Sequence, residues 1–252
     1  MTPDPTTLLD MAGITTPLIG FYDVADPRPF EPFARPGRCI FSCYKDWLQG
    51  QRVCISEGTC SCQGGGYWVG GVMPGWVRNV AGTDREPREI FAHGLNRREG
   101  FKSSDELLCQ WFGNLDPYII EKGYVVIGPL QDDHYEDLKT VTFYVNPDQL
   151  SLLILGAEYN NASTEDTPVR APFGSGCGQI AAVLGDGDIP QAVIGATDIA
   201  MREHVPPDIL AFTVNKPMYR QLCQLGDDSF LYKSFWKRLR SVRSYSGSGL
   251  AN

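Results

Sequence analysis

Two glycine-rich segments, each containing one cysteine, are the parts of this sequence best suited to carry chemistry. Cys177 stands in the segment 172–178, Pro-Phe-Gly-Ser-Gly-Cys-Gly, and Cys62 opens the segment 62–66, Cys-Gln-Gly-Gly-Gly. Glycine permits positive φ angles and lets backbone N–H groups approach a ligand closely. We therefore expect the two segments to bind a ligand or a metal, or to support thiol chemistry.

The surroundings of Cys177 indicate a strand that runs into a glycine turn and then into a helix. Val169 precedes the turn, and the apolar run 180–184 follows it. A sulfur at the positive end of a helix is stabilised as a thiolate, so we expect Cys177 to be the most reactive thiol, with a pKa below the usual value of about 8.5. The alternative is a small apolar residue packed beneath the turn, as free cysteines often are.

These considerations predict a set of site residues. Cys62 and Cys177 are the candidate catalytic residues and also the candidate metal ligands. The candidate cofactor-binding residues are those of the two turns: Gly64, Gly65, Gly66, Gly174, Ser175, Gly176 and Gly178. The turns contain neither a Walker loop nor the Gly-x-Gly-x-x-Gly spacing of dinucleotide sites. The cofactor is left open, with a metal ion or an iron–sulfur cluster as the candidates.

Five cysteines gather in the N-terminal part of the chain, at positions 39, 43, 54, 60 and 62. On a helix Cys39 and Cys43 share one face, and in an extended segment Cys60 and Cys62 share one side. Four such sulfurs are enough for a zinc or iron–sulfur site, but the spacing matches neither zinc ribbons nor ferredoxins. Buried thiols are the alternative.

The histidines and the acidic segment give weaker signals. His93, His134 and His204 are isolated in sequence, so a structural hydrogen bond is the default for each, although a Cys–His couple across the fold stays open. The acidic segment 132–137 lacks the ligand order and glycine of a calcium loop, and we expect an exposed loop there.

Composition favours an acidic protein of the cytoplasm. The chain has 252 residues, 42% of them hydrophobic, and a formal net charge of −8. This charge argues against nucleic acid or an anionic membrane as the main partner and favours a small-molecule ligand, with an oligomer left open. The short basic run 237–240 with Arg243 is interpreted as the solvated face of a C-terminal helix. The sequence shows no signal peptide or membrane-spanning segment, so we expect a cytoplasmic location and free thiols.

The elements that must position the cysteines follow an α/β or α+β pattern with a mixed sheet. Apolar periodicity predicts helices over 5–14 and 38–48, two more within 85–115 of which the second is capped by Ser104, and one over 147–159. Runs of β-branched and aromatic residues predict strands at 17–22, 124–128, 140–145, 169–171, 192–196 and 210–214, followed by helices up to 243. We expect one domain over 1–243, helix-rich to about residue 120 and alternating from 121 to 243, with a flexible tail at 244–252.

One junction occurs twice. The sequences Phe-Tyr-Val-Asn-Pro at 143–147 and Phe-Thr-Val-Asn-Lys-Pro at 212–217 both join a predicted strand to a predicted helix. An asparagine cap followed by proline in the first turn suits the start of a helix. The repeat predicts two similar strand-to-helix units.

Several of these runs resemble a known family. They are the segments 138–150, 171–177, 188–198, 47–50 and 62–66. Together they resemble the bacterial and archaeal family called domain of unknown function 169, over roughly residues 15–243. The family usually has a Gly-Cys-Gly-Gly turn where this chain has Ser61-Cys62-Gln63-Gly64. The resemblance thus implies a domain and the two positions Cys62 and Cys177, while Cys39, Cys43, Cys54 and Cys60 lie outside its motif.

Three functions follow as hypotheses. The leading one is a small ligand, metal or redox cofactor bound where the Cys62 and Cys177 turns converge. The second is a cysteine-dependent enzyme, using the two thiols as an acid/base pair or as nucleophiles. The third is a non-catalytic sensor or accessory subunit in which the turns are structural.

Overall fold

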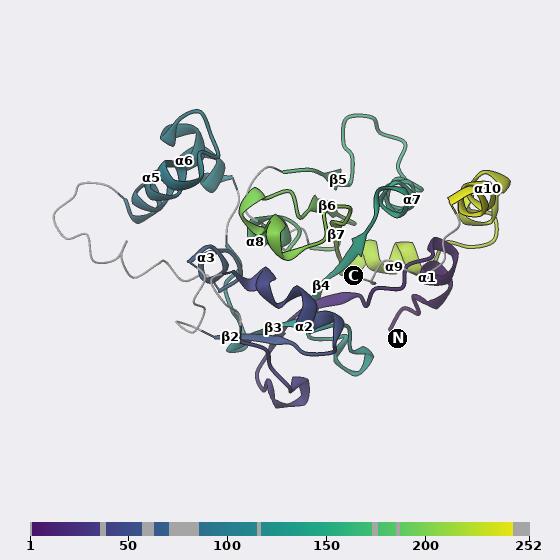
Figure 1. Cartoon of the computed structure of the whole chain (residues 1–252), viewed down its shortest axis with the longest axis horizontal. Coiled ribbons are helices and arrows are strands. Elements are labelled where there is room, and N and C mark those ends of the chain that lie inside the picture. Colours follow the sequence, from purple (N-terminus) through teal and green to yellow (C-terminus); the bar gives the residue numbers. More distant parts are fainter. Residues whose placement is uncertain are drawn as a thin grey trace.

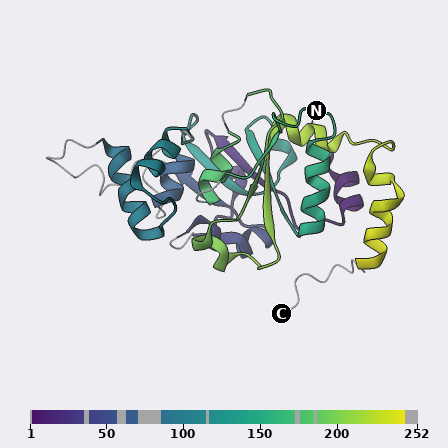
Figure 2. The same ribbon diagram turned by 90° about the horizontal axis from the view of Figure 1, so that it is seen from above.

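The computed structural model describes residues 2–35, 39–56, 63–70, 86–114, 117–172, 176–184 and 187–243. Within them the chain forms a mixed seven-stranded sheet with helices on both faces, which confirms the α/β prediction (Figure 1). Helices α5 and α6 lie at one end of the molecule and α10 at the other (Figure 2). In the described residues no helix is long and apolar enough to cross a membrane.

The strands are joined in the order β2-β3-β1-β4-β7-β6-β5. Their bounds are β1 Ile19–Val24, β2 Val53–Ser56, β3 Tyr124–Pro129, β4 Leu138–Val145, β5 Val169–Arg170, β6 Ala192–Gly195 and β7 Leu210–Asn215. Neighbouring strands are antiparallel except β5 and β6, which pair in parallel.

The helices fall into two layers. Their bounds are α1 Thr6–Ala12, α2 Tyr44–Leu48, α3 Gln63–Gly70, α5 Pro87–Glu99, α6 Asp105–Gly113, α7 Pro147–Ala157, α8 Gly176–Ala181, α9 Lys216–Cys223 and α10 Ser234–Arg243. The side chains of α2, α3, α5, α6 and α8 join one buried cluster, and those of α1, α7, α9 and α10 join the other.

The strand sequences divide between these two clusters because successive side chains of a strand point to opposite faces. In β1, Phe21 lies in the first cluster and Tyr22 in the second. In β4, Tyr144 lies in the first and Phe143 in the second. Both faces are therefore apolar and covered, which explains why these strands read as continuous hydrophobic runs.

The segment that contains Cys177 is a βαβ unit. β5 leads into α8, which packs against β6, and β6 lies parallel to β5. The carboxyl ends of both strands therefore point the same way. The residues that follow Arg170 and Gly195 both leave the sheet at this edge, where open α/β sheets usually bind ligands.

The repeated junction has the predicted chemistry. Asn146 caps α7 by accepting from the N–H of Gln149 at 3.0 Å, and Asn215 caps α9 by accepting from the N–H of Met218 at 3.1 Å. The two strands that feed these helices, β4 and β7, are paired neighbours, and the two helices pack together. The two predicted strand-to-helix units are thus confirmed as adjacent.

Two local predictions need correction. The helix predicted over 38–48 is a 3₁₀ helix, Ile40–Cys43, followed by the short α2, and Cys39 precedes both in extended conformation. Cys39 and Cys43 therefore do not share an α-helical face. In addition, β2 was missed, because its four residues give too short an alternation to distinguish a strand.

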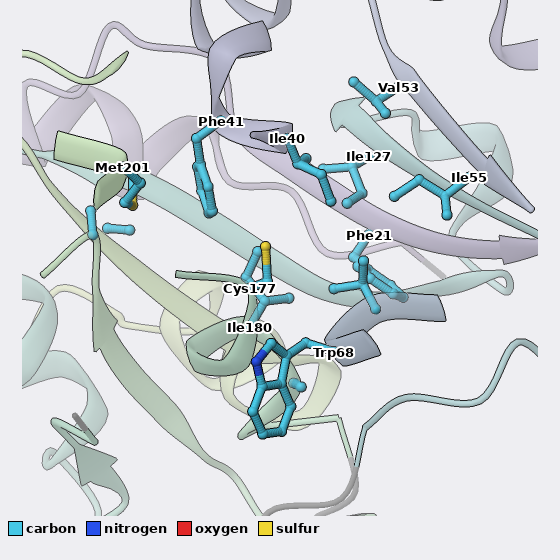
Figure 3. Close-up of a cluster of buried hydrophobic side chains, with 14 of the residues drawn as sticks. Phe21, Ile40, Phe41, Val53, Ile55, Trp68, Ile127, Cys177, Ile180 and Met201 are labelled. Carbon is cyan, nitrogen blue, oxygen red and sulfur yellow. The ribbon is translucent and has the colours of Figure 1, made fainter. Parts of the chain in front are cut away.

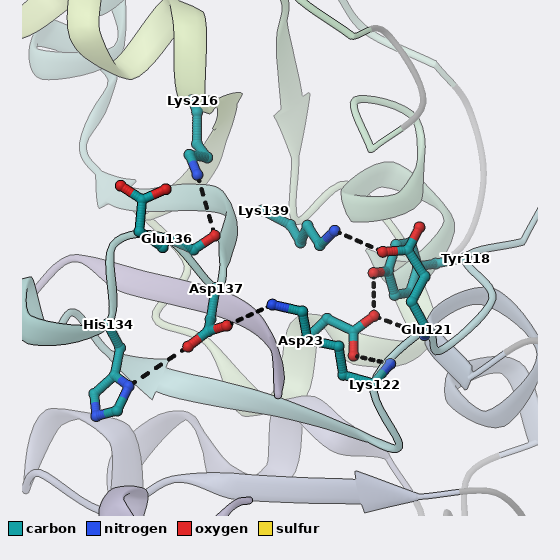
Figure 4. Close-up of polar contacts among 9 residues, drawn as sticks. All are labelled: Asp23, Tyr118, Glu121, Lys122, His134, Glu136, Asp137, Lys139 and Lys216. Carbon is teal, nitrogen blue, oxygen red and sulfur yellow. Dashed lines mark hydrogen bonds and ion pairs between the residues drawn. The ribbon is translucent and has the colours of Figure 1, made fainter. Parts of the chain in front are cut away.

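A buried carboxylate ties the segment after α6 to the sheet (Figure 4). Asp23 in β1 is fully buried, and it accepts hydrogen bonds from the Tyr118 hydroxyl and from the N–H groups of Glu121 and Lys122. A buried carboxylate is tolerated when several donors satisfy it. Asp23 therefore fixes the entry into β3.

The acidic segment 132–137 contributes a second polar contact in the same region. Asp137 accepts from Lys122 Nζ at 2.7 Å and lies 3.6 Å from His134 Nδ1. Burial raises the pKa of Asp137, but Lys122 and His134 outweigh it and leave the pKa below its ordinary value. This carboxylate therefore stabilises the fold when it is charged.

Candidate functional site

A cavity of about 240 Å³ lies against the edge of the βαβ unit. Its walls come from α3, α5, α8 and the 3₁₀ helices Ile40–Cys43 and Ile199–His204, with Cys39 beside them. These segments are far apart in sequence. They meet in the folded chain, where α3 packs directly on α8.

The cavity joins residues of both glycine-rich segments. Gly64 and Gly65 at the start of α3 line it, and so do Gly176 and Cys177 at the start of α8. Of the other predicted site residues, Gly66 and Gly178 lie in the same two helices but outside the cavity wall. Cys62, Gly174 and Ser175 lie outside the described residues, so the joint site of Cys62 and Cys177 stays a prediction.

The two glycine walls differ in how tightly they are packed. A Cβ added to Gly176 would lie 2.7 Å from the ring of Phe41 and 2.8 Å from the sulfur of Met201. A Cβ added to Gly64 would meet nothing within 4 Å. The start of α8 is therefore closed by its neighbours, whereas the start of α3 faces open space.

Cys177 is the second residue of α8, as predicted, but it is only 4% exposed (Figure 3). It belongs to the buried cluster that contains Phe41, Trp68 and Ile180. The strand and the helix predicted on either side of the turn are confirmed, and the turn itself, at 173–175, lies outside the described residues. The burial of Cys177 agrees with the alternative interpretation of a small packed side chain.

A carboxylate faces the start of α8. Asp198 Oδ2 accepts from the N–H of Gly176 at 3.2 Å, and its Oδ1 accepts from the N–H of Ala200 at 2.9 Å. Burial raises the pKa of Asp198, partly offset by these two N–H groups. A negative group here competes with an anionic ligand for the N–H of Gly176.

The segment that presents Asp198 is strained and firmly held. Ala196, directly after β6, is buried in the left-handed conformation with φ of 59°. Arg202 donates to the carbonyls of Ala196, Ile209, Pro206 and Pro207 at 2.6 to 3.2 Å. Strain that is held in place by surrounding contacts is typical of binding and catalytic segments.

Among the side chains of the cavity wall that were not predicted as site residues, Cys39 and His204 could take part in thiol chemistry with Cys177. Cys39 was set aside because it lies outside the family motif, and His204 because it is isolated in sequence. The pKa of the buried Tyr144 is raised by burial first and further by Tyr44, Cys177 and Cys39. The thiols of Cys39 and Cys177 therefore both influence the pKa of the Tyr144 hydroxyl, although 138 positions separate the two cysteines in sequence. Asp198 could have been recognised from the sequence as a candidate site residue, because it stands just after the strand predicted at 192–196.

The charged side chains of Arg98 and Glu203 belong to the cavity wall and are largely exposed, and we call them the rim. Arg98 donates to Glu99 at 2.7 Å, and His204 lies 3.6 Å from Glu203. The apolar side chains of the wall are buried or partly buried: Phe41, Leu95, Trp68, Phe101 and Met201. The site thus combines buried apolar side chains with exposed charged ones, as ligand pockets generally do, and Asp198 adds a buried carboxylate.

The N-terminal cysteines do not form one cluster across the described residues. Cys43 packs on the face of the sheet that holds α3 and α8, whereas Cys54 in β2 packs on the opposite face. Over the same described residues, no group of three or more His, Cys, Asp or Glu side chains is arranged to hold a metal ion. A metal site that joins all five of these cysteines is therefore wrong, because Cys43 and Cys54 lie on opposite faces of the sheet. The four-sulfur site of Cys39, Cys43, Cys60 and Cys62 stays a prediction, since Cys60 and Cys62 lie outside the described residues.

Comparison with known proteins gives a family match. The sequence model of the family DUF169, described as an uncharacterised ArCR, covers residues 11–224. This range contains every described residue of the cavity wall and ends before α10. No curated protein and no solved structure matches the chain.

Proposed function

This chain belongs to the DUF169 family, and we propose that its family domain binds a small organic molecule in the cavity between α3 and α8. One observation carries the proposal. Gly64 and Gly65 line the same cavity as Gly176 and Cys177, although more than a hundred residues separate the two pairs. The strained Ala196 beside this cavity supports the same conclusion.

The size and the walls of the cavity indicate the kind of ligand. Pockets for drug-sized molecules have volumes of about 300 to 1,000 Å³, so a volume of about 240 Å³ fits a smaller molecule. Trp68 and Phe101 suit an apolar or planar body, and the rim suits one polar end. A small ring compound with a single polar group has this shape.

The charge of the wall favours a neutral or positively charged ligand over an anion. Asp198 already accepts the N–H of Gly176, and Glu99 and Glu203 add two further carboxylates. Arg98 is paired with Glu99. We therefore propose a ligand whose polar end meets carboxylates, in preference to an anion held by the glycine N–H groups.

A cysteine-dependent enzyme is the second candidate, and the position of Cys39 favours it. Cys39 and Cys177 line one cavity together with His204, so two thiols and a base would face a bound molecule. The burial of Cys177 and the nearby Asp198 weigh against a thiolate in the free protein. For this reason ligand binding is proposed first.

The test blocks the cavity from its open wall. Gly64→Phe adds a large side chain where a Cβ meets nothing, and Gly113→Phe adds the same side chain at another helical glycine that also has open space. Gly113 is exposed at the end of α6 and does not line the cavity. A library of small ring compounds carrying amine, hydroxyl or carboxylate groups is screened against all three proteins by ligand-observed NMR.

We expect compounds that bind the wild type and the Gly113→Phe variant and that lose binding in Gly64→Phe. Thermal unfolding of each variant shows whether the fold is intact. If Gly64→Phe unfolds, Gly64→Leu repeats the test with a smaller side chain. Equal binding to all three proteins, or binding to none, would overturn the proposal. Selection of carboxylates over amines would leave the cavity as the site but overturn the assignment of charge.

A further inference from the structure

A second concave surface lies on the opposite side of the sheet from the cavity, between α7 and α10. Its volume is about 410 Å³, and its walls include Leu152 and Leu155 of α7 with Phe235 and Leu239 of α10. Phe230, from the 3₁₀ helix Phe230–Tyr232, closes one part of it. We call this surface the α7–α10 groove.

One face of α10 holds the helix on the body of the protein. Trp236 Nε1 donates to the carbonyl of Met11 at 2.6 Å, and Arg240 donates to the same carbonyl at 3.0 Å. Arg243 pairs with Asp148 of α7 at 3.0 Å. Residues 236, 240 and 243 are spaced by four and three, so they share one helical face. The position of α10 beside α7 is therefore fixed.

The remaining surface of α10 exposes large apolar side chains. Phe235 is 84% exposed and Val242 is 71% exposed, and Leu155 across the groove is 56% exposed. Residues 235, 239 and 242 again follow the spacing of one helical face. An exposed apolar patch with a regular helical pattern marks a surface that another protein covers.

Positive charge borders this patch. Lys233 and Arg238 are exposed beside it, because position 238 adjoins positions 235 and 242 on the helix, although the chain as a whole has a formal net charge of −8. Lys233 lines the groove itself, and so does Asp148, whose charge is paired with Arg243. The groove is therefore an apolar channel with a local positive border on an acidic protein, which selects against a positively charged partner.

We propose that the α7–α10 groove binds one amphipathic helix of a partner protein, with an apolar face and acidic flanks. Recognition of this kind places apolar side chains at i, i+3 or i+4, and i+7 into a groove between two helices. Acidic flanks complement the cationic border. The family match ends at residue 224, so the α7 wall of the groove lies inside the matched range and the α10 wall lies outside it. Among the described residues the groove and the cavity share no lining residue, so this proposal is independent of the function proposed for the cavity.

Two other occupants are less suited. A second copy of the chain, docked by a two-fold axis through α10, would place Lys237 and Arg238 near their own counterparts, and like charges repel. An anionic membrane would meet the charge of −8 on the rest of the chain.

The test uses a fluorescein-labelled, 18-residue designed peptide with leucine on one helical face and glutamate on both flanks. A matched peptide carries lysine in place of glutamate. Fluorescence anisotropy measures binding to the wild type, to Phe235→Ser and to the double variant Lys233→Glu, Arg238→Glu. Ile119→Ser is the control, because Ile119 is 72% exposed and does not line the groove.

We expect the glutamate peptide to bind the wild type and Ile119→Ser at least tenfold more tightly than it binds the other two variants, and the lysine peptide to bind at least tenfold more weakly. Raised salt should weaken the binding, because the cationic border is exposed. No binding of the glutamate peptide, or equal binding of both peptides, would overturn the proposal. A dimer that Phe235→Ser dissociates in sedimentation, or binding to phosphatidylglycerol vesicles that this variant loses, would assign the groove to a second copy or to a membrane instead.

Discussion

Alanine in place of Gly64 or Gly176 tests how the cavity is built, because the two glycines line it from opposite walls. At Gly176 the new Cβ would lie 2.7 Å from Phe41 Cε2 and 2.8 Å from Met201 Sδ. Both neighbours are almost fully buried, so neither side chain can move into solvent. Extra volume in a packed core costs about 1 to 3 kcal/mol. At Gly64 the Cβ meets nothing.

The two substitutions should therefore change the free energy of unfolding in opposite directions. Replacing glycine by alanine without strain stabilises a protein by about 0.4 to 1 kcal/mol through the unfolded state. For Gly64→Ala this gain stands alone, whereas for Gly176→Ala the clash outweighs it and leaves a net loss of about 1 to 2 kcal/mol. For a chain of this size, about 2 to 4 °C of Tm corresponds to 1 kcal/mol.

Thermal unfolding followed by circular dichroism measures both changes. We expect Gly64→Ala to raise Tm by about 1 to 4 °C and Gly176→Ala to lower it by about 2 to 8 °C. Gly113→Ala is the control, because it also has open space but lies outside the cavity wall. If Gly176→Ala is as stable as Gly64→Ala, the start of α8 is not packed against Phe41 and Met201, and the described wall of the cavity is wrong.

Three further predictions follow from the polar contacts and the thiols. Asp23→Ala leaves three donors without their acceptor and should lower the free energy of unfolding, measured by urea denaturation, by about 2 to 4 kcal/mol. The control Asp26→Ala, at an exposed carboxylate, should have little effect. A small loss for Asp23→Ala would contradict the buried network. The pKa of Asp137 is lowered in the folded state, so its contribution to stability is present above the unfolded pKa of about 4 and is lost as pH falls through the folded pKa. Asp137→Asn should therefore remove this part of the acid sensitivity of the free energy of unfolding. An unchanged pH profile of urea unfolding in this variant would refute the prediction. Iodoacetamide should label Cys177 more slowly than the partly buried Cys39, because burial and a nearby carboxylate both oppose the thiolate; faster labelling of Cys177 in site-resolved mass spectrometry would instead support the reactive thiol predicted from sequence.

Local chemistry explains the elements that the sequence predicted correctly. The helix starts at Ser104, Asn146 and Asn215 depend on a side chain that accepts a hydrogen bond from the N–H three residues further on, and such contacts need no distant partner. The strand runs at 124–128 and 140–145 were recognisable because both faces of the sheet are covered, so most positions are apolar or β-branched. The short elements were not predicted correctly, because their form does not depend on local chemistry alone. β2 and the 3₁₀ helix Ile40–Cys43 contain too few residues to show a period, and contacts with the rest of the fold decide their form.

The candidate site divides in the same way. The residue types and glycine spacing of the Cys177 segment predicted a strand, a turn and a helix there, because β-branched residues favour extended backbone and glycine permits the conformations that turns require. That Gly64 and Cys177 line one cavity depends on the packing of α3 on α8, and no residue spacing records it. The burial of Cys177 and its relation to Asp198 also arise between segments that only the sheet brings together. The sequence by itself determined which residues are able to do chemistry, and the tertiary structure decided their neighbours, because burial and charge at a site are set by side chains distant in the chain.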